Sequence, residues 1–252
     1  MKKSILKIAT ICLMGTSLFA SNNTIIPTEQ KSPQQVLKDS FNFMGALDKY
    51  KVTAKSNHLL YDGHGTLRAQ YKNEYKILVD RPYKAYIEVE GDTKYREYFF
   101  NAGNYTLYNE ERIKYWGDMK TPAKVDDALK FMMDKYGVKE PISVLVFSNM
   151  ADKIKPNSVS YFGIKMKNGK QCHEIGFKSK DHKKNIYVWI SALGNPLIEA
   201  FTISRKTAVN EYRINVDVKW DLKPWISDSD FIFKKRGNGK KIPIQIKKGR
   251  QF

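Results

Sequence analysis

The side chains that could do chemistry are few in this sequence, and they are far apart. Cys172 and His173 are neighbours in a segment of strand-like composition, so their side chains would point to opposite faces and cannot pair as nucleophile and base. The histidine pairs, His58 with His64 and His173 with His182, lack the spacing and the further ligands of a recognised metal site. These residues predict neither a catalytic centre nor a bound metal or cofactor.

Paired acids could act as a general acid and base, but local structure accounts for them here. Asp126 and Asp127 stand early in a predicted helix, where the helix dipole favours negative charge. Glu110 and Glu111 fall in a predicted turn, where they would face solvent. The sequence has no glycine-rich phosphate-binding loop. We therefore expect a protein that is not an enzyme.

The aromatic side chains carry a stronger signal. Residues 95–116, YREYFFNAGNYTLYNEERIKYW, contain eight aromatic rings interleaved with charged side chains. Each buried ring removes about 150–250 Å² from water, so the rings must be covered by protein, by ligand, or by each in turn. An ordinary packed core is one interpretation, and a cavity for an apolar ligand is the other.

The first residues predict export. Residues 1–20, MKKSILKIATICLMGTSLFA, have lysines ahead of an apolar run that ends at Ala20, as in a secretory signal peptide. Removal of this segment lowers the net charge from +18 to +15, because it carries three lysines and no acid. Cys172 is then the single cysteine, so no intramolecular disulfide can form. We expect a soluble periplasmic protein with a polar linker at residues 21–31.

Two kinds of element must position the rings. Ser32 as a cap, Pro33 at the first helical position and Gln35 three residues after the cap predict a helix that ends near Tyr50. From residue 51 to 116 the pattern changes to β-favouring segments separated by turn signals. This change predicts an antiparallel meander.

Turn chemistry predicts how the aromatic stretch pairs. A two-residue loop at residues 102–103 would pair Phe100 with Tyr105, and a second at residues 110–111 would pair Tyr105 with Trp116. Both faces of the sheet would then be apolar, so something must cover the second face. One face would hold Tyr98, Phe100, Tyr105, Leu107 and Trp116, and the other would hold Tyr95, Phe99, Tyr108, Ile113 and Tyr115.

The segment after the meander is the expected cover. Thr121 and Pro122 begin a predicted helix that Gly137 stops. A second start follows at Pro141, and its β-branched residues leave helix and strand open. Two short helices here would suit a lid. A second run of strands is expected from about residue 159 to residue 221.

Five phrases give the sequence a family resemblance: RPYKAYIEVEGDTKYREYFFNAGNYTLYNEERIKYW, VDDALKFMMDKYGVKEPISVLVF, KQCHEIGFKSK, YVWISALGNPLIEAFTI and ISDSDFIFKK. Over about residues 33–236 the chain resembles a predicted-periplasmic family in the superfamily of the lipoprotein carriers LolA and LolB. That resemblance implies an α+β fold, mainly antiparallel β, in which an incomplete, half-open β-barrel is covered by a helical lid. It also implies a hydrophobic cavity for acyl chains. The carriers latch the lid with an arginine on an early strand, and Arg68 is the candidate here.

We therefore expect residues 32–233 to form a LolA-like domain that holds a lipid, an acyl chain or a lipoprotein without covalent chemistry. The alternative is a regulatory or structural interaction protein of the cell envelope, with a closed core and no lipid ligand. The predicted cavity lining is Tyr98, Phe100, Tyr105, Leu107, Trp116, Leu129, Met132, Met133, Leu145 and Phe147.

The C-terminal end is strongly basic. Residues 234–252, KKRGNGKKIPIQIKKGRQF, carry eight Lys or Arg and no acid. One interpretation is a solvated, mobile tail, and the other is attraction to an anionic membrane surface. Export argues against nucleic acid as a partner.

Overall fold

The computed structural model describes residues 31–110, 113–138, 140–153, 158–179 and 181–245. The predicted signal peptide, the linker up to residue 30 and the last seven residues of the basic tail lie outside the described residues. In this described part of the chain, no helix has the length and apolar character needed to cross a membrane.

The described residues form one open sheet of twelve strands. The first six follow one another as a meander: β1 (Lys49–Asp62), β2 (Leu67–Asp80), β3 (Lys84–Gly91), β4 (Lys94–Asn101), β5 (Asn104–Glu110) and β6 (Lys114–Lys120). A second meander comprises β7 (Val159–Lys167), β8 (Lys170–Lys178), β9 (Asn185–Ser191), β10 (Ile198–Lys206) and β11 (Asn210–Asp221). The two meanders join where β11 pairs with β1.

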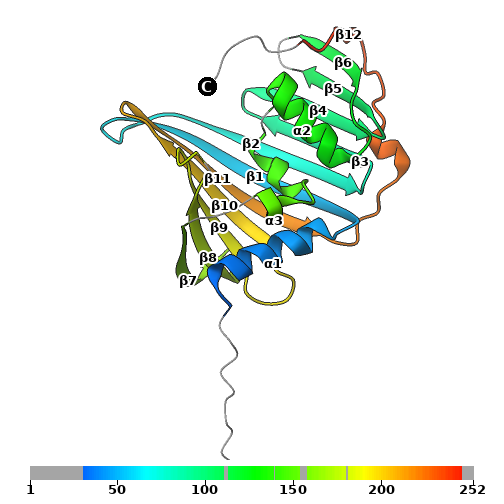
Figure 1. Cartoon of the computed structure of the whole chain (residues 1–252). Helices are drawn as coiled ribbons and strands as arrows, with labels where there is room; N and C mark the ends of the chain where they lie inside the picture. Colours follow the sequence, from blue (N-terminus) through cyan, green and yellow to red (C-terminus); the bar gives the residue numbers. More distant parts are fainter. Residues whose placement is uncertain (1–30, 111–112, 139, 154–157, 180, 246–252) are drawn as a thin grey trace, which may run out of the picture. The chain divides into compact units, whose positions relative to one another are not determined.

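The sheet is antiparallel except at one edge, where the short strand β12 (Lys240–Lys241) pairs in parallel with β6. Its strand order is β12-β6-β5-β4-β3-β2-β1-β11-β10-β9-β8-β7. Figure 1 shows the sheet curving around the side on which the helices α1, α2 and α3 lie. The predicted fold class, a mainly antiparallel and incomplete barrel with few helices, is confirmed.

Helix α1 (Pro33–Gly45) begins as the sequence predicts, since the Ser32 hydroxyl accepts a hydrogen bond from the Gln35 backbone N–H at 3.2 Å. It ends earlier than expected, because Tyr50 belongs to β1 and is fully buried there. Gly45 allows a close approach at the helix end. A Cβ atom at this position would lie 2.1 Å from the Ser148 carbonyl oxygen.

Three short elements between β6 and β7 form what we call the lid: α2 (Val125–Tyr136), the 3₁₀ helix η1 (Pro141–Leu145) and α3 (Met150–Lys153). Helix α2 starts after Lys124 rather than after Thr121, and it ends at Gly137, whose φ of 66° is the left-handed conformation that glycine favours. The element at Pro141, which the sequence left open, is a 3₁₀ helix.

The first predicted hairpin of the aromatic stretch is confirmed. Ala102 and Gly103 both have positive φ, as a two-residue hairpin loop requires, and Phe100 lies opposite Tyr105. The second predicted hairpin is wrong, because β5 continues through Glu110 and Glu110 pairs with Lys114. Trp116 therefore lies opposite Tyr108 and on the other face of the sheet from Tyr105.

Both faces of this part of the sheet are apolar, as expected, but they have different covers. The lid and α1 pack on the concave face in one core cluster with residues such as Tyr98, Phe100 and Tyr105. Residues 222–245, which we call the C-terminal strap, supply the cover of the convex face through Ile226, Phe231 and Phe233. Phe231 of the strap is buried among Leu78, Tyr86 and Phe99. The lid alone was expected to supply the cover, and that expectation is corrected here.

The strap includes the first part of the basic tail. Phe233 packs its ring against Phe99, Tyr108 and Trp116, with ring centroids 5.3–5.7 Å apart. The Arg236 guanidinium donates to the buried Glu97 carboxylate at 2.9 Å. Farther along, the Ile242 backbone N–H donates to the Trp116 carbonyl at 2.8 Å. Contacts with the sheet thus continue past residue 233, the predicted end of the domain, at Arg236, in β12 and at Ile242.

Candidate functional site

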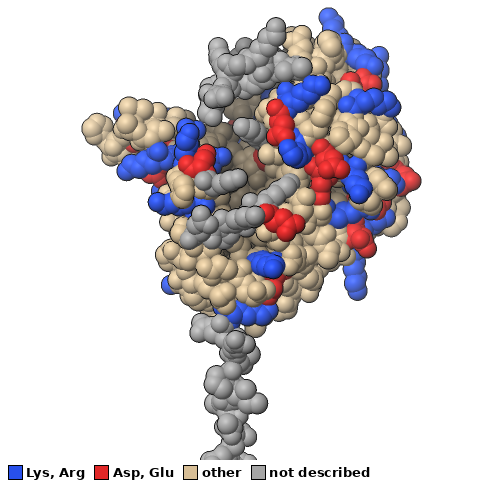
Figure 2. Space-filling model, viewed as in Figure 1, with Lys and Arg blue, Asp and Glu red and all other residues tan. Residues whose placement is uncertain are grey.

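A groove of about 750 Å³ opens between the lid and strands β10 and β11. Its floor includes Ile203 and Ile214, which lie opposite each other in the β10–β11 ladder. Figure 2 shows the surface hollowed beside the projecting ends of β1, β2, β10 and β11. The lining residues are Lys130, Met133, Asp134, Glu140, Pro141, Ser143, Val144, Phe147, Met150, Lys184, Ile203, Arg205, Tyr212 and Ile214.

Strand periodicity explains the floor. Along β10 every second residue faces the concave side, which places Phe201 in the core, Ile203 in the groove and Arg205 at the groove lining. The lid supplies the opposite wall with Met133 from α2 and Val144 from η1. Ligand sites in proteins commonly enclose about 300–1,000 Å³ with an apolar lining and a few polar groups. The groove matches that description.

The structure separates the ten predicted lining residues into three groups. Met133 and Phe147 line the groove. Trp116 lies on the convex face beneath Phe233 of the strap. The other seven belong to the concave core: Tyr98, Phe100, Tyr105, Leu107, Leu129, Met132 and Leu145.

The space expected beneath α2 is filled by packed side chains. Tyr98, Phe100, Leu129 and Met132 surround a cavity of only about 20 Å³. Room for a ligand therefore lies next to the predicted position, toward β10 and β11. Whether any of the ten residues contacts a ligand stays a prediction.

A buried polar network joins the lid to the sheet. The guanidinium of Arg81, just after β2, donates to the Tyr50 hydroxyl at 3.0 Å and lies 3.7 Å from the Asp126 carboxylate of α2. The Tyr50 hydroxyl in turn donates to the Leu145 carbonyl of η1 at 2.7 Å. Burial raises the pKa of Tyr50, so this hydroxyl keeps its proton. Asp126 also accepts hydrogen bonds from the backbone N–H and the hydroxyl of Ser148.

Arg68, the predicted latch, occupies a different place. It stands at the start of β2 and pairs with Asp62 at 2.6 Å across the β1–β2 hairpin, with its side chain 62% exposed. Asp62 also accepts the backbone N–H groups of His64 and Thr66, so Arg68 braces the hairpin turn. Arg81, at the other end of β2, is the arginine that contacts Asp126 of the lid, and a latch role for either arginine stays a prediction.

A second polar network, which no sequence pattern predicted, lies on the concave face next to the groove. His58 Nε2 lies within hydrogen-bond distance of the Asn73 amide nitrogen (3.0 Å) and the Ser56 hydroxyl (2.9 Å), and His58 Nδ1 lies 2.6 Å from the Tyr212 hydroxyl. Tyr212 completes the chain with the Tyr71 hydroxyl at 2.8 Å. Burial, followed by the charge of Lys94, lowers the pKa of His58 to about 4. His58 is therefore neutral at ordinary pH.

The other chemically reactive groups are separated as the sequence predicts. Cys172 lies opposite Ser191 and His173 opposite Ile190, on alternate faces of β8. Burial raises the pKa of the Cys172 thiol and lowers that of His173. The His173 ring is hydrogen-bonded to the Tyr161 hydroxyl at 2.9 Å. Among the described residues, no three His, Cys, Asp or Glu side chains form a group that could hold a metal ion.

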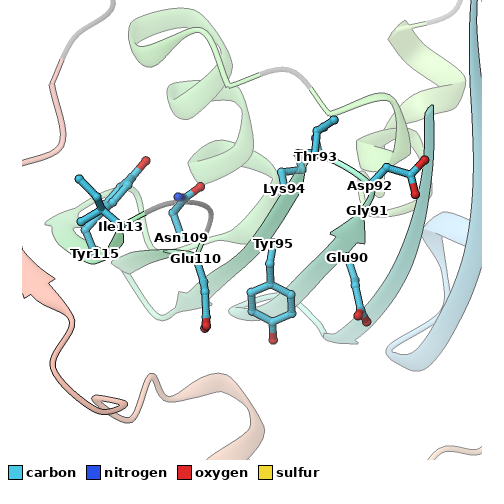
Figure 3. Close-up of a pocket in the computed structure, with 10 residues that line it drawn as sticks. All are labelled: Glu90, Gly91, Asp92, Thr93, Lys94, Tyr95, Asn109, Glu110, Ile113 and Tyr115. Carbon is cyan, nitrogen blue, oxygen red and sulfur yellow. The ribbon is translucent and has the colours of Figure 1, made fainter. Parts of the chain in front are cut away.

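A polar hollow of about 870 Å³ lies at the β3–β4 and β5–β6 turns. Figure 3 shows Glu90, Tyr95 and Glu110 pointing to one side of the sheet there, with Thr93 and Lys94 on the other. The lining of the hollow combines acids, an amide and a lysine with Tyr95, Ile113 and Tyr115, so polar and apolar surface are about equal, whereas the groove is mainly apolar. It is therefore a poorer candidate for an apolar ligand than the groove.

Several groove residues were missed from the sequence. Ile203, Arg205, Tyr212 and Ile214 lie on two adjacent strands, and the alternation in IEAFTISRK indicates which side chains share a face. Nothing in that alternation tells which helix covers them. The pairing of Met133 with Ile203 across the groove needs the folded chain.

A family model described as "Predicted periplasmic protein (DUF2092)" matches residues 33–245 of the chain. This match includes the whole described sheet, the lid and the strap. A comparison with curated protein sequences gave no match.

Solved structures with a related arrangement are distant in sequence. The Mycobacterium tuberculosis lipoprotein LppX is 10% identical, with a TM-score of 0.44 over 77% of this chain and 97% of LppX. LprF from Mycobacterium bovis is 12% identical, with a TM-score of 0.45 over 77% of this chain and 95% of LprF. A LolA superfamily protein from Nitrosomonas europaea is 8% identical, with a TM-score of 0.38 over 81% of this chain and 99% of that protein.

Proposed function

Because the chain belongs to the predicted periplasmic protein family DUF2092, we propose that it acts in the periplasm as a non-catalytic binder or carrier of an acyl chain. The acyl chain would belong to a lipid or to a lipoprotein. The observation that carries this proposal is the groove between the lid and β10–β11, with a volume of about 750 Å³.

The groove has the surface that a hydrocarbon chain needs. Ile203 and Ile214 form an apolar floor, and Met133, Val144 and Met150 face it from the lid. Methionine side chains are flexible and can pack against ligands of different shape. Each CH₂ group buried there would release about 0.8 kcal/mol, so a chain of a dozen methylenes would gain roughly 10 kcal/mol before the costs of ordering and of moving the lid.

The test is the binding of a neutral apolar dye whose fluorescence rises in an apolar site, such as N-phenyl-1-naphthylamine. Ile203→Trp would fill the groove floor, and we expect it to weaken dye binding at least tenfold. Ser204→Trp is the matched control, because residue 204 lies on the opposite face of the same strand. Equal dye binding by the wild type and Ile203→Trp would place the dye elsewhere and contradict the proposal.

Exposed apolar side chains favour the alternative function, an interaction protein of the cell envelope. The indole of Trp225 is 90% exposed, and the side chains of Ile164 and Met166 on the edge strand β7 are 54% and 66% exposed. Exposed aromatic and methionine side chains are common in protein interfaces. A single stoichiometric protein partner that is lost in Trp225→Ser, together with no dye binding by the wild type, would favour this function over the carrier.

A further inference from the structure

The charges around the groove do not balance. Its lining includes two acids, and both have partners: Glu140 accepts from Lys94 at 3.1 Å and from the Tyr98 hydroxyl at 3.0 Å. The other acid, Asp134, is paired with Lys130 one helical turn away. These pairs neutralise the lid side of the groove.

Among the described residues, the sheet side carries two cations that form no ion pair, although the charge of Lys184 helps to lower the pKa of the exposed Asp181 carboxylate. Lys184, just before β9, and Arg205, near the end of β10, both line the groove. Within the described parts of the chain neither side chain has a hydrogen bond or an ion pair, whereas the neighbouring Arg213 is paired with Glu211 at 2.7 Å. An excess of positive charge therefore remains beside the apolar floor.

Arg205 is held in position by its strand. It lies directly opposite Tyr212 in the β10–β11 ladder and two residues beyond Ile203 on the same face. Its side chain is partly buried, so its charge is less screened than that of a fully exposed lysine. The Tyr212 hydroxyl beside it is anchored by His58 and Tyr71. Arg205 and Tyr212 thus form a rim of the groove, with a fixed cation and an ordered hydroxyl next to the apolar floor.

We propose that the groove selects anionic lipids, whose acyl chain lies on Ile203 and Ile214 while a carboxylate or phosphate head is bound by Arg205 and Lys184. This inference rests on the proposed function and adds the chemical class of the ligand. Guanidinium groups bind carboxylates and phosphates through paired N–H donors. The apolar floor and the cations lie in the same groove, so one amphipathic molecule can satisfy both.

The experiment compares two lipids that have the same chain and different heads. Oleate and oleyl alcohol are each used to displace N-phenyl-1-naphthylamine from the wild-type protein, below their aggregation concentrations. We expect oleate to bind about tenfold tighter, as hydrogen bonds to a charged head would give. Raising the salt concentration from 0.05 to 0.5 M should reduce this preference, because the rim is partly exposed.

Two substitutions test whether Arg205 and Lys184 cause the preference for oleate over oleyl alcohol. Arg205→Gln and Lys184→Gln should each weaken oleate binding more than oleyl alcohol binding, so the preference shrinks. Lys206→Gln and Lys183→Gln are the matched controls, since they remove the same charge from adjacent positions that do not line the groove. The inference would be overturned if the preference for oleate over oleyl alcohol persisted in both Arg205→Gln and Lys184→Gln. It would also be overturned if the control variants reduced this preference by the same amount.

The outcomes also separate this inference from the proposed function. Equal displacement by oleate and oleyl alcohol would overturn the anionic selectivity and leave the acyl-chain site standing. Displacement by neither lipid would contradict the acyl-chain site, and the selectivity with it. Single-chain lysophosphatidylglycerol and lysophosphatidylcholine identify the source of the anion. Tighter binding of lysophosphatidylglycerol than of lysophosphatidylcholine shows that the site accepts an anionic phosphate head. Tighter binding of oleate than of both lysophospholipids shows a preference for a carboxylate.

Discussion

Arg81 illustrates how a single side chain can hold the lid on the sheet. Its guanidinium reaches the Tyr50 hydroxyl of β1 and the Asp126 carboxylate of α2, and its side chain is only 10% exposed. We predict that Arg81→Gln lowers the free energy of unfolding by about 2–4 kcal/mol, because it leaves buried partners without a cation. The measurement is urea denaturation followed by tryptophan fluorescence.

Arg68→Gln is the control for that prediction. The Arg68 side chain pairs with Asp62 in an exposed hairpin, and exposed ion pairs contribute less than about 1 kcal/mol. If Arg68→Gln cost as much as Arg81→Gln, or if Arg81→Gln cost nothing, the assignment of the latch to Arg81 would be wrong.

His58 gives the protein a predictable response to acid. An unfolded histidine titrates near pH 6.5, whereas burial lowers the pKa of His58 in the folded protein to about 4. Between these values the unfolded state binds a proton that the folded state does not, so stability falls as the pH falls. The loss should approach roughly 3 kcal/mol by pH 4. Above pH 6.5 this histidine contributes no pH dependence.

The measurement is the free energy of unfolding from pH 7.5 to pH 4 for the wild type and for His58→Gln. Carboxylates titrate in both proteins, so the difference between the two curves isolates His58. We expect the difference in the free energy of unfolding between the wild type and His58→Gln to become smaller as the pH falls below 6.5. If the free energies of unfolding of the two proteins changed in parallel with pH, burial would not lower the pKa of His58.

At the scale of elements, the C-terminal strap is the least expected part of the fold. From residue 234 onward its sequence is basic and includes Gly237 and Gly239, which favours a mobile tail. Phe233 nevertheless packs against three rings of the convex face, and Arg236 meets the buried Glu97. The buried Phe231, the rings around Phe233 and the pairing of β12 with β6 also hold the strap on the sheet.

We predict that Phe233→Ala destabilises the protein by about 2–3 kcal/mol, because it exposes the rings that Phe233 covers and removes part of a buried ring. Ile232→Ala is the matched control, since the neighbouring Ile232 side chain is 51% exposed, and it should cost less than about 1 kcal/mol. Thermal unfolding of both variants checks this. Equal stability of the two variants would show that the strap is not anchored at Phe233.

Local turn chemistry allowed some pairings to be predicted, while loop length prevented others. Ala102 and Gly103 specify a two-residue loop, so Phe100 and Tyr105 could be paired from the sequence. The connection after Glu110 is longer than two residues, and this difference moves Trp116 to the convex face. A register follows from sequence only where the turn residues determine the loop length.

At the scale of the whole molecule, the sequence predicts the kind of fold but not the position of the open space. The alternation of strands and the cap at Ser32 are local features, and both are found in the structure. The groove joins Met133 of the lid to Ile203, seventy residues later in the chain. Such a contact depends on how the two meanders curve around the lid, and no local pattern records it.

The same limit applies to the latch and the strap. Arg68 and Arg81 stand at opposite ends of β2, and their folded partners, Asp62 for Arg68 and Asp126 for Arg81, distinguish them. Glu97 and Arg236 are likewise far apart in the sequence and meet in the folded protein at 2.9 Å. The partners of these charged residues are set by tertiary structure and not by any local sequence pattern.

The proposed function requires an acyl chain to lie between the lid and β10–β11. The most direct measurement is photolabelling of the full-length protein with a fatty acid that carries a diazirine near its methyl end, followed by peptide mass spectrometry. We predict adducts on the peptides that contain Met133, Val144 and Ile203, and their loss in Ile203→Trp but not in Ser204→Trp. Adducts confined to outer positions such as Trp225, or unchanged labelling in Ile203→Trp, would contradict the account.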